Sequence, residues 1–563
     1  MLQIEELRTQ TGDDTADRYR AEGRWRTDAT ILDDLRKHAR THPDRRAVVC
    51  RHVDGSAPEE LTYAELAATV ERLASGLAAL GVRKGDVVTL QLPNSWQLIA
   101  LCLACTRIGA VAGPVLPIMR SREVRFLLEL TESPVYIAPV RHRNFSFAEM
   151  SADLQGDIPS LRHRVLLGAA EAGGNTPGTE GAFDFDTALL GDPSTSPDAL
   201  SAGTGGREAG PDDAAYIMFT SGTTGEPKGV VHTYNTLYAT SRVQADALGL
   251  TGEDVTAMGS PTTHNAGFTW NFAMPLTLGA TCVHIDQWDA ATMLRILEEE
   301  RVTFFMGAPP FLVDLIAEQR AEQRDLSHLR TFATGSAPIP PVLVDQAHSV
   351  LGCRLYALWG MTENGCVTIT RPEDPSMRAA ESDGTTLPGM EVRILDSMNG
   401  APVRPGETGR LQVRGAHQCL GYFRRPETYE ASLSADGWFD TGDLARDDGY
   451  GGIRIVGREK DLISRGGEKI PVAEVEGALL RHPAIQDVAV VGYPDARLGE
   501  RACAVIVPDG EDLPELSALQ HHLDSLGMAK QYWPERVEAA DVLPKTPSGK
   551  VQKFRIREQL NGV

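Results

Sequence analysis

The segment from Thr220 to Lys228 reads TSGTTGEPK and combines hydroxyl side chains, glycines and one lysine. Glycines let backbone N–H groups approach an anion closely, hydroxyl groups add donors, and the lysine supplies positive charge. The spacing differs from a Walker A loop, in which lysine directly follows the last glycine, because Glu226 and Pro227 intervene here. The segment therefore predicts a phosphate-binding loop of another kind, with a plain surface loop as the alternative.

The residues around this loop alternate between short apolar strands and helical patterns. From about residue 60 to 165, and again from the loop to the segment RLYALWGMTE, the alternation predicts two units in which helices cover a parallel sheet. Ligands of such units bind at the ends of the strands. Short strands and turns predict a smaller β-rich piece from about 385 to 456. About the last hundred residues show an α/β pattern that can fold by itself.

The composition is that of an acidic globular protein. A chain of 563 residues exceeds what one hydrophobic core supports, so two or more domains are expected. The formal net charge of -22 argues against nucleic acid and anionic membranes as partners, and a polyanion must be held by local donors. The segment from about 168 to 213 is rich in Gly, Pro, Ser, Thr and acids, and we expect a partly disordered surface excursion.

The sequence gives no indication of export or of membrane insertion, so a cytoplasmic location is expected. The N-terminus has early acids and lacks an apolar signal region. The most apolar stretch, Leu98 to Met119, is interrupted by Arg107 and by Gly and Pro, which favours a buried helix followed by a strand. The eight cysteines are scattered and are expected to be reduced. Cys102 and Cys105 lack a second ligand pair for a zinc site.

Four further segments follow the loop in a fixed order: YALWGMTENG, GWFDTGDLA, GREKDLISRGGEKI and LPKTPSGKVQK. With the loop, they resemble the ordered motifs of the adenylate-forming superfamily, which includes acyl-CoA synthetases, luciferases and peptide-synthetase adenylation domains. The resemblance extends from about Leu61 to Lys553. The segments WGMTEN and SGKVQKFRIRE make the chain most similar to medium-chain, aryl and alicyclic acid CoA ligases.

The resemblance implies a two-step reaction and a domain arrangement. A carboxylate attacks the α-phosphate of ATP, giving an acyl-adenylate and pyrophosphate, and the thiol of coenzyme A then displaces AMP. Residues 1–459 would form the large N-terminal domain, with two doubly wound αβ subdomains and the β-rich subdomain. Residues 460–563 would form a smaller, mobile α+β domain that carries the catalytic lysine.

The resemblance also implies how the phosphates and the metal are held. Thr362 would donate to the α-phosphate, and Glu363 would hold Mg²⁺, which is typically bound through one or two carboxylates together with phosphate oxygens. Lys550 would stabilise charge between the acid and the α-phosphate, although a lysine in such a loop is ordinarily solvated. The β and γ phosphates would be wrapped by Thr220, Ser221, Gly222, Thr223, Thr224, Gly225 and Lys228.

Other positions match the nucleoside, hinge and thiol sites of the family. Asp443 would accept from the ribose hydroxyls, Arg458 would contact ribose or phosphate, and Lys460 matches the hinge, with a solvated turn lysine as the alternative. Trp359 would stack on adenine or serve as a core aromatic. Adenine would lie along Gly335, Ser336 and Ala337, next to Gly360, and the pantetheine channel would be lined by Gly466 and Gly467.

The acid pocket is the least specific part of the resemblance. His264 would border the acid and gate the thiol route, although a lone histidine is more often structural. No acidic residue in HNAGFTWNF could pair with an α-ammonium, which disfavours amino acids. A compact aromatic, alicyclic or short to medium-chain acid fits better. The expected lining is Asn265, Ala266, Gly267, Trp270, Met306, Gly360 and Cys366.

One departure and two alternatives remain. Relatives often have a second lysine where AKQYWPER has Tyr532, which puts the CoA step in question. The same adenylation could instead load a carrier protein in secondary metabolism, or activate nitrite to diazotise an arylamine. A non-catalytic binding relative is disfavoured because the expected catalytic positions are all retained. We expect a monomer or a homodimer.

Overall fold

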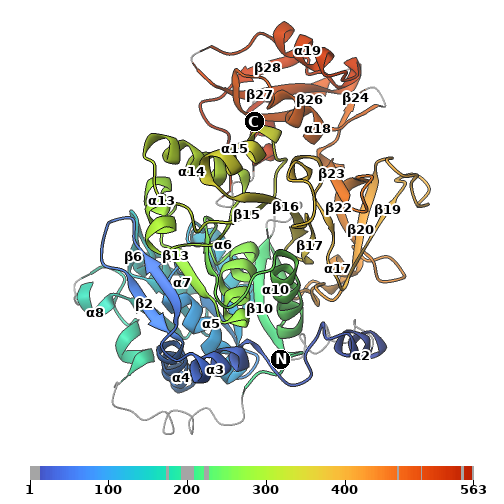
Figure 1. Ribbon diagram of the computed structural model, residues 1–563. Coiled ribbons are helices and arrows are strands. Elements are labelled where there is room, and N and C mark those ends of the chain that lie inside the picture. The colour runs from blue at the N-terminus through green and yellow to red at the C-terminus, as the bar shows by residue number, and fades with distance from the viewer. Residues whose placement is uncertain are drawn as a thin grey trace.

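The computed structural model describes residues 13–172, 176–191, 208–220, 227–465, 468–495, 497–510, 512–546 and 551–560. These residues form two large mixed sheets, a smaller antiparallel sheet and a separate C-terminal sheet. Figure 1 shows the C-terminal part, in orange and red, above the rest of the molecule. The predicted α/β class, with a large N-terminal and a smaller C-terminal part, is confirmed.

The largest sheet has nine strands within the described residues. Its central strands are parallel, as the alternation of strands and helices predicts, and antiparallel strands close both edges. The helices on its connections are α12 (Met274–Leu278), α13 (Ala290–Glu299), α14 (Pro309–Ala321) and α15 (Pro341–Leu351). In spatial order the strands are β18 (Thr385–Thr386), β17 (Gly365–Ile369), β16 (Arg354–Met361), β15 (Thr331–Gly335), β14 (Phe304–Met306), β12 (Val255–Met258), β13 (Thr281–Ile285), β1 (Arg46–Arg51) and β2 (Glu59–Thr62).

The second large sheet has eight strands within the described residues. It is parallel except at one edge, where β10 and β11 form an antiparallel hairpin that continues into β21. Its helices are α4 (Tyr63–Ala79), α5 (Trp96–Ile108), α6 (Ser121–Thr131), α7 (Phe147–Asp157) and α10 (Tyr234–Leu248). In spatial order the strands are β21 (Gly421–Tyr422), β11 (Lys228–Thr233), β10 (Ala214–Thr220), β4 (Val111–Pro114), β3 (Val87–Leu90), β5 (Val135–Pro139), β8 (His163–Leu167) and β9 (Phe183–Asp184).

The most apolar stretch of the sequence is a buried helix followed by a strand, as predicted. Helix α5 begins after Ser95, whose hydroxyl accepts from Leu98 N, and ends at Gly109 with φ +69°. Its Arg107 is paired with Glu71 at 2.9 Å, which explains how the charge is accommodated. No helix within the described residues is long and apolar enough to cross a membrane. All eight cysteines are buried free thiols.

The smaller sheets occupy the second half of the chain. The antiparallel sheet consists of β19 (Met390–Leu395), β20 (Gly409–Gly415), β22 (Phe439–Asp447) and β23 (Ile453–Arg458), as the β-rich texture predicts. Short helices α16 (Arg378–Glu381) and α17 (Pro426–Glu430) flank it. The C-terminal sheet consists of β25 (Glu468–Ile470), β24 (Ile463–Arg465), β27 (Gly499–Pro508), β26 (Ile485–Asp495) and β28 (Arg536–Ala539), with helices α18 (Val472–Leu479), α19 (Leu516–Ser525) and α20 (Lys553–Leu560).

The C-terminal sheet has apolar clusters of its own, one of which extends from Ile463 to Leu523. The turn η3 (Glu459–Asp461) joins it to β23. In the polar segment from 168 to 213 the structure describes α8 (Ala169–Ala172), β9 and a π-helical turn, Asp186–Leu190. Residues 173–175 and 192–207 of that segment lie outside the described residues, and the expectation of partial disorder there stays a prediction.

Candidate active site

The phosphate-loop segment spans the tip of the β10–β11 hairpin. The strands pair antiparallel, and the pair nearest the tip joins Thr220 to Lys228. The hairpin therefore holds the two ends of the loop side by side, at an edge of the second sheet. The Lys228 ammonium lies 4.8 Å from the centre of the Tyr422 ring. Of the residues expected to wrap phosphate, five lie outside the described residues: Ser221, Gly222, Thr223, Thr224 and Gly225.

Thr362 and Glu363 occupy the tip of a second hairpin, formed by β16 and β17. Asn364 N donates to Met361 O at 3.2 Å, and Gly365 follows with φ +59°. This is a tight turn closed by a left-handed residue, which explains the glycine. A Cβ atom at Gly365 would also lie 2.7 Å from Thr240 Oγ1 on α10. Both conformation and space therefore require glycine directly after the Thr-Glu-Asn turn.

Three neighbours hold the Thr362–Glu363 turn. Tyr422 OH donates to Glu363 Oε1 at 2.8 Å, and Cys419 N donates to Glu363 O at 2.7 Å. His232, on β11, donates through Nε2 to Thr362 O at 2.7 Å. Burial and the nearby Glu363 carboxylate raise the pKa of the Tyr422 phenol, which therefore stays protonated as a donor. The turn is thus fixed against the strand that follows the phosphate loop.

The expected adenine segment lies at the end of β15. A Cβ atom at Gly335 would lie 2.5 Å from Leu358 O on the neighbouring strand. Ser336 then adopts a left-handed conformation, φ 73°, and is exposed together with Ala337. Gly360 is exposed as well, and a Cβ there would be 2.2 Å from Gly365 O. These small residues leave the main chain accessible at the carboxyl ends of two neighbouring strands, as the binding of a flat ring requires.

Asp443 joins the expected nucleoside residues. Its Oδ2 accepts from Trp359 Nε1 at 3.0 Å, and its Oδ1 lies 2.9 Å from Arg458 Nε. Asp443 and Arg458 are paired residues on β22 and β23. Each carboxylate oxygen retains a further acceptor site for a ribose hydroxyl. The Trp359 ring is 8% exposed and packs in an apolar cluster with Leu411 and other side chains, an arrangement that favours the core alternative for this residue.

The C-terminal contributions are described only in part. The Lys460 backbone lies in η3, between β23 and β24. Gly466, Gly467 and Lys550 lie outside the described residues. The ends of the Lys550 loop are held together by the bridge between Lys545 and Val551 and by the bond from Gln552 N to Pro544 O, 2.7 Å.

The expected acid-pocket residues come together around one apolar cluster. Trp270, Met306 and Cys366 all belong to it, and the Trp270 ring stacks on Phe304 at 5.6 Å between centroids. Partly buried Ala266 packs against the same cluster. Burial raises the pKa of the Cys366 thiol to about 12, so at neutral pH it is an uncharged member of this cluster and not a thiolate nucleophile.

His264 and the residues after it form a tight bend next to that cluster. His264 caps α11 (Asn265–Phe268), and its Nδ1 accepts from Ala266 N at 3.3 Å. A Cβ at Gly267 would lie 2.2 Å from Pro261 O, so the bend needs glycine. The Asn265 side chain accepts from Tyr216 OH at 2.8 Å. The bend therefore faces the β10–β11 hairpin.

The sequence and the structure of this chain match known proteins along nearly their whole length. A model of the AMP-binding enzyme matches residues 35–423, and a model of the AMP-binding enzyme C-terminal domain matches residues 474–550. The chain belongs to the AMP-binding enzyme family. The predicted adenylate-forming family and the enzyme class are thereby confirmed.

Relatives of this AMP-binding enzyme act on different acids. The medium-chain fatty-acid–CoA ligase of Escherichia coli (strain K12) is 34% identical over 543 residues, 96% of this chain and 92% of that protein. The 2,3-dihydroxybenzoate-AMP ligase of Bacillus subtilis (strain 168) is 32% identical over 553 residues, 98% and 97% of the two chains. The anthranilate CoA ligase AuaEII, solved with anthranoyl-AMP, superposes with a TM-score of 0.83 at 25% identity and covers 95% of this chain and 98% of its own.

The donor set at the turn of this AMP-binding enzyme fits a magnesium ion bound with a nucleotide. Glu363 offers one carboxylate, and Mg²⁺ usually binds through one or two carboxylates, phosphate oxygens and several waters. In the described part of the chain, no three His, Cys, Asp or Glu side chains form a group that could hold a metal by themselves. A magnesium ion at Glu363 would accordingly depend on the phosphates of the substrate.

Two residues at this site are absent from the sequence-based prediction. Tyr422 and His232 contact the Thr362–Glu363 turn, yet both lie far from it in sequence. Tyr422 is in a GYFRRPE segment, and His232 is the residue before the last one of β11, the strand after the phosphate loop. Only strand pairing brings them to the turn, so composition and spacing could not identify them.

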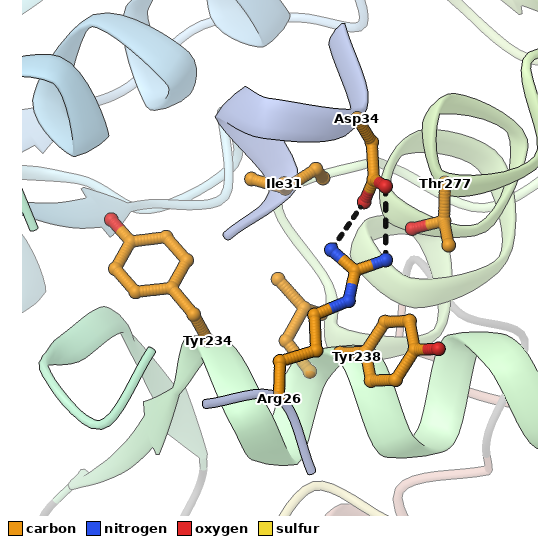
Figure 2. A pocket seen from close by; sticks show the side chains of 7 residues that line it. Arg26, Ile31, Asp34, Tyr234, Tyr238 and Thr277 are labelled. Carbon is orange, nitrogen blue, oxygen red and sulfur yellow. Dashed lines mark hydrogen bonds and ion pairs between the residues drawn. The ribbon is translucent and has the colours of Figure 1, made fainter. Parts of the chain in front are cut away.

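A small pocket elsewhere in this AMP-binding enzyme is unrelated to the site. It is lined by residues of the N-terminal segment, α3 (Ile31–Thr41), α10 and α12. Figure 2 shows that Arg26 enters it and pairs with Asp34, at 2.7 and 2.9 Å, while its guanidinium lies over Tyr238. None of the expected site residues lines it. It is a junction that attaches the N-terminal segment to α3 and α10.

Proposed function

We propose that this protein is an AMP-forming acid:CoA ligase for a small aromatic, alicyclic or short to medium-chain carboxylic acid. The observation that carries the proposal is the β16–β17 hairpin. Its tip holds Thr362 and Glu363 next to the phosphate-loop strand, and Cys366, two residues beyond Asn364, is in the apolar cluster. On this proposal, one hairpin would contribute to both the nucleotide side and the acid side, which suits a reaction that joins them.

In the proposed first step, the acid carboxylate attacks the α-phosphate and pyrophosphate leaves. Lys228 supplies charge to the departing phosphates, and Thr362 orients the α-phosphate. Asp443, already oriented by Trp359 and Arg458, holds the ribose. A magnesium ion at Glu363 would neutralise charge on the phosphates. Lys550 would enter from the C-terminal domain and stabilise the charge that develops at the α-phosphate.

The acid class rests on the chemistry of the cluster. Trp270, Met306 and Cys366 are apolar and buried, so an α-ammonium placed among them would lack a charged partner. An apolar acyl group is stabilised there by burial of its surface. The three relatives named above, which act on medium-chain, dihydroxybenzoic and anthranilic acids, agree with compact or medium-length acyl groups.

One observation supports the second candidate, the same adenylation with another acceptor, such as a carrier protein. Tyr532, where relatives often have a second lysine, packs against an apolar cluster of the C-terminal domain. This position thus provides no cation for the phosphates of CoA. No comparable observation supports nitrite activation for diazotisation of an arylamine. Nitrite is therefore included among the substrates of the test below.

The test combines the purified protein with ATP, Mg²⁺ and single members of a panel of benzoates, cyclohexane acids, fatty acids and nitrite. Pyrophosphate release is followed with and without CoA, and products are identified by mass. Release that depends on CoA, with thioester formed, would establish the ligase and name its acid. Release that is indifferent to CoA would contradict the CoA step and favour the second candidate.

A further inference from the structure

His232 makes two hydrogen bonds in the interior of the protein, one in which its ring donates and one in which its ring accepts. It is 2% exposed on β11. Its Nε2 lies 2.7 Å from Thr362 O, and its Nδ1 lies 3.0 Å from Thr236 Oγ1 on α10. A carbonyl oxygen only accepts, so Nε2 carries the hydrogen. Nδ1 then accepts from the Thr236 hydroxyl, and one tautomer satisfies both ring nitrogens.

The environment keeps this ring neutral. Burial lowers the pKa of His232 to about 4, so the imidazole is uncharged at neutral pH. A neutral donor suits this position, because a positive charge on the ring would repel a cation bound at Glu363. The ring therefore acts through its hydrogen bond and not through its charge.

His232 also connects the turn to the acid side. It pairs across the hairpin with Tyr216, and the two rings stack with centroids 5.2 Å apart and planes 16° apart. Tyr216 OH in turn donates to the Asn265 side chain at 2.8 Å. A continuous line of contacts thus runs from the Thr362 carbonyl through two stacked rings to the bend at the acid pocket.

We propose that His232 is a positioning residue for adenylation, which fixes the Thr362–Glu363 turn through the Nε2–H bond to the Thr362 carbonyl. The inference rests on the proposed function only in assigning that turn to the α-phosphate and magnesium. His232 touches neither substrate. The alternative is that the ring merely fills space between β11 and α10.

Three substitutions separate the hydrogen bond from the volume. In His232→Gln the amide N–H can take the place of Nε2–H and reach Thr362 O. In His232→Asn the shorter amide can reach only toward Thr236, and His232→Leu keeps bulk without any donor. Tyr216→Phe is the matched control, because it keeps the stacked ring and removes only the donor to Asn265.

The first readout is steady-state adenylation, measured as pyrophosphate release with the acid that the substrate panel selects. We expect kcat to fall about 10- to 100-fold in the Leu and Asn variants, the factor for a buried carbonyl that loses its donor. The Gln variant should remain within about threefold of wild type. Tyr216→Phe should raise the KM for the acid and leave kcat nearly unchanged. Thermal unfolding of each variant reports whether it is folded.

The second readout does not need the acid. Calorimetric titration with ATP in the presence and absence of Mg²⁺ should show weaker MgATP binding in the Leu and Asn variants, by about tenfold, and a smaller loss of metal-free ATP binding, because metal-free ATP meets Thr362 but needs no metal at Glu363. Equal loss in the Gln and Leu variants, or no loss in either readout for folded protein, would overturn the proposal. A wild type that binds MgATP but adenylates no acid would refute the proposed function, while the titration still decides the role of His232.

Discussion

Replacing Tyr422 by phenylalanine removes a single hydroxyl group from the site and leaves the ring in place. The Tyr422 ring lies under the Lys228 ammonium at 4.8 Å, an interaction that phenylalanine retains. The lost contact is the bond from Tyr422 OH to Glu363 Oε1, 2.8 Å. Glu363 is 8% exposed, so water cannot readily replace the missing donor.

The expected size of the effect follows from the charge and burial of that carboxylate. A hydrogen bond to a charged group contributes about 1.5–3 kcal/mol, which corresponds to a factor of about 10 to 150 in an equilibrium constant. If Tyr422 orients Glu363 for magnesium, this factor should appear in the apparent KM for Mg²⁺. The KM for the acid should change little, because the acid pocket is unaltered.

The assay is pyrophosphate release at saturating ATP and acid, with Mg²⁺ as the titrated component. Tyr429→Phe is the matched control. Tyr429 belongs to the same apolar cluster, its ring contacts Tyr422 edge-on, and its hydroxyl donates to Cys419 O at 3.0 Å. We expect that control to lower thermal stability without changing the Mg²⁺ dependence. An unchanged Mg²⁺ dependence in Tyr422→Phe would refute the role of Tyr422 in orienting Glu363 for the metal.

Three further outcomes are expected. Lys550→Ala should abolish adenylate formation and leave ATP affinity nearly unchanged, and surviving pyrophosphate release would exclude Lys550 as the catalytic lysine. Gly365→Ala should lower the free energy of unfolding by about 1–2 kcal/mol or more. The loss should exceed that of the control Gly400→Ala, because both glycines have positive φ but only Gly365 also faces the Thr240 side chain. Equal denaturation midpoints for the two variants would contradict this reasoning. Thermal stability should decrease as pH falls from about 6.5 to about 4. In that range the histidines of the unfolded chain bind protons, whereas three buried histidines of the folded protein, with pKa values of about 4, stay neutral: His232, His284 and His417. A melting temperature that does not change over this pH range would contradict their burial.

The sequence alone determined those features that depend on local pattern. Alternating strands and helices predicted the parallel sheets, and an apolar stretch interrupted by Arg107 and by Gly and Pro predicted the buried α5 followed by β4. The ordered motifs identified the family, because five short segments in a fixed order carry far more information than any one of them. The argument against amino acid substrates likewise needed only the sequence, because the segment HNAGFTWNF contains no acidic residue.

Contacts between distant segments were decided by the tertiary structure. Strand pairing places Tyr422 and His232 at the Thr362–Glu363 turn, although each lies dozens of residues from it, and it places the Trp359 indole on Asp443 instead of leaving the ring free. Residue type and spacing predict local conformation, because helix and strand periodicity depends on residues only a few positions apart. Which side chain completes a hydrogen bond in the interior depends on the register between strands, and that register is set by the packing of the whole sheet.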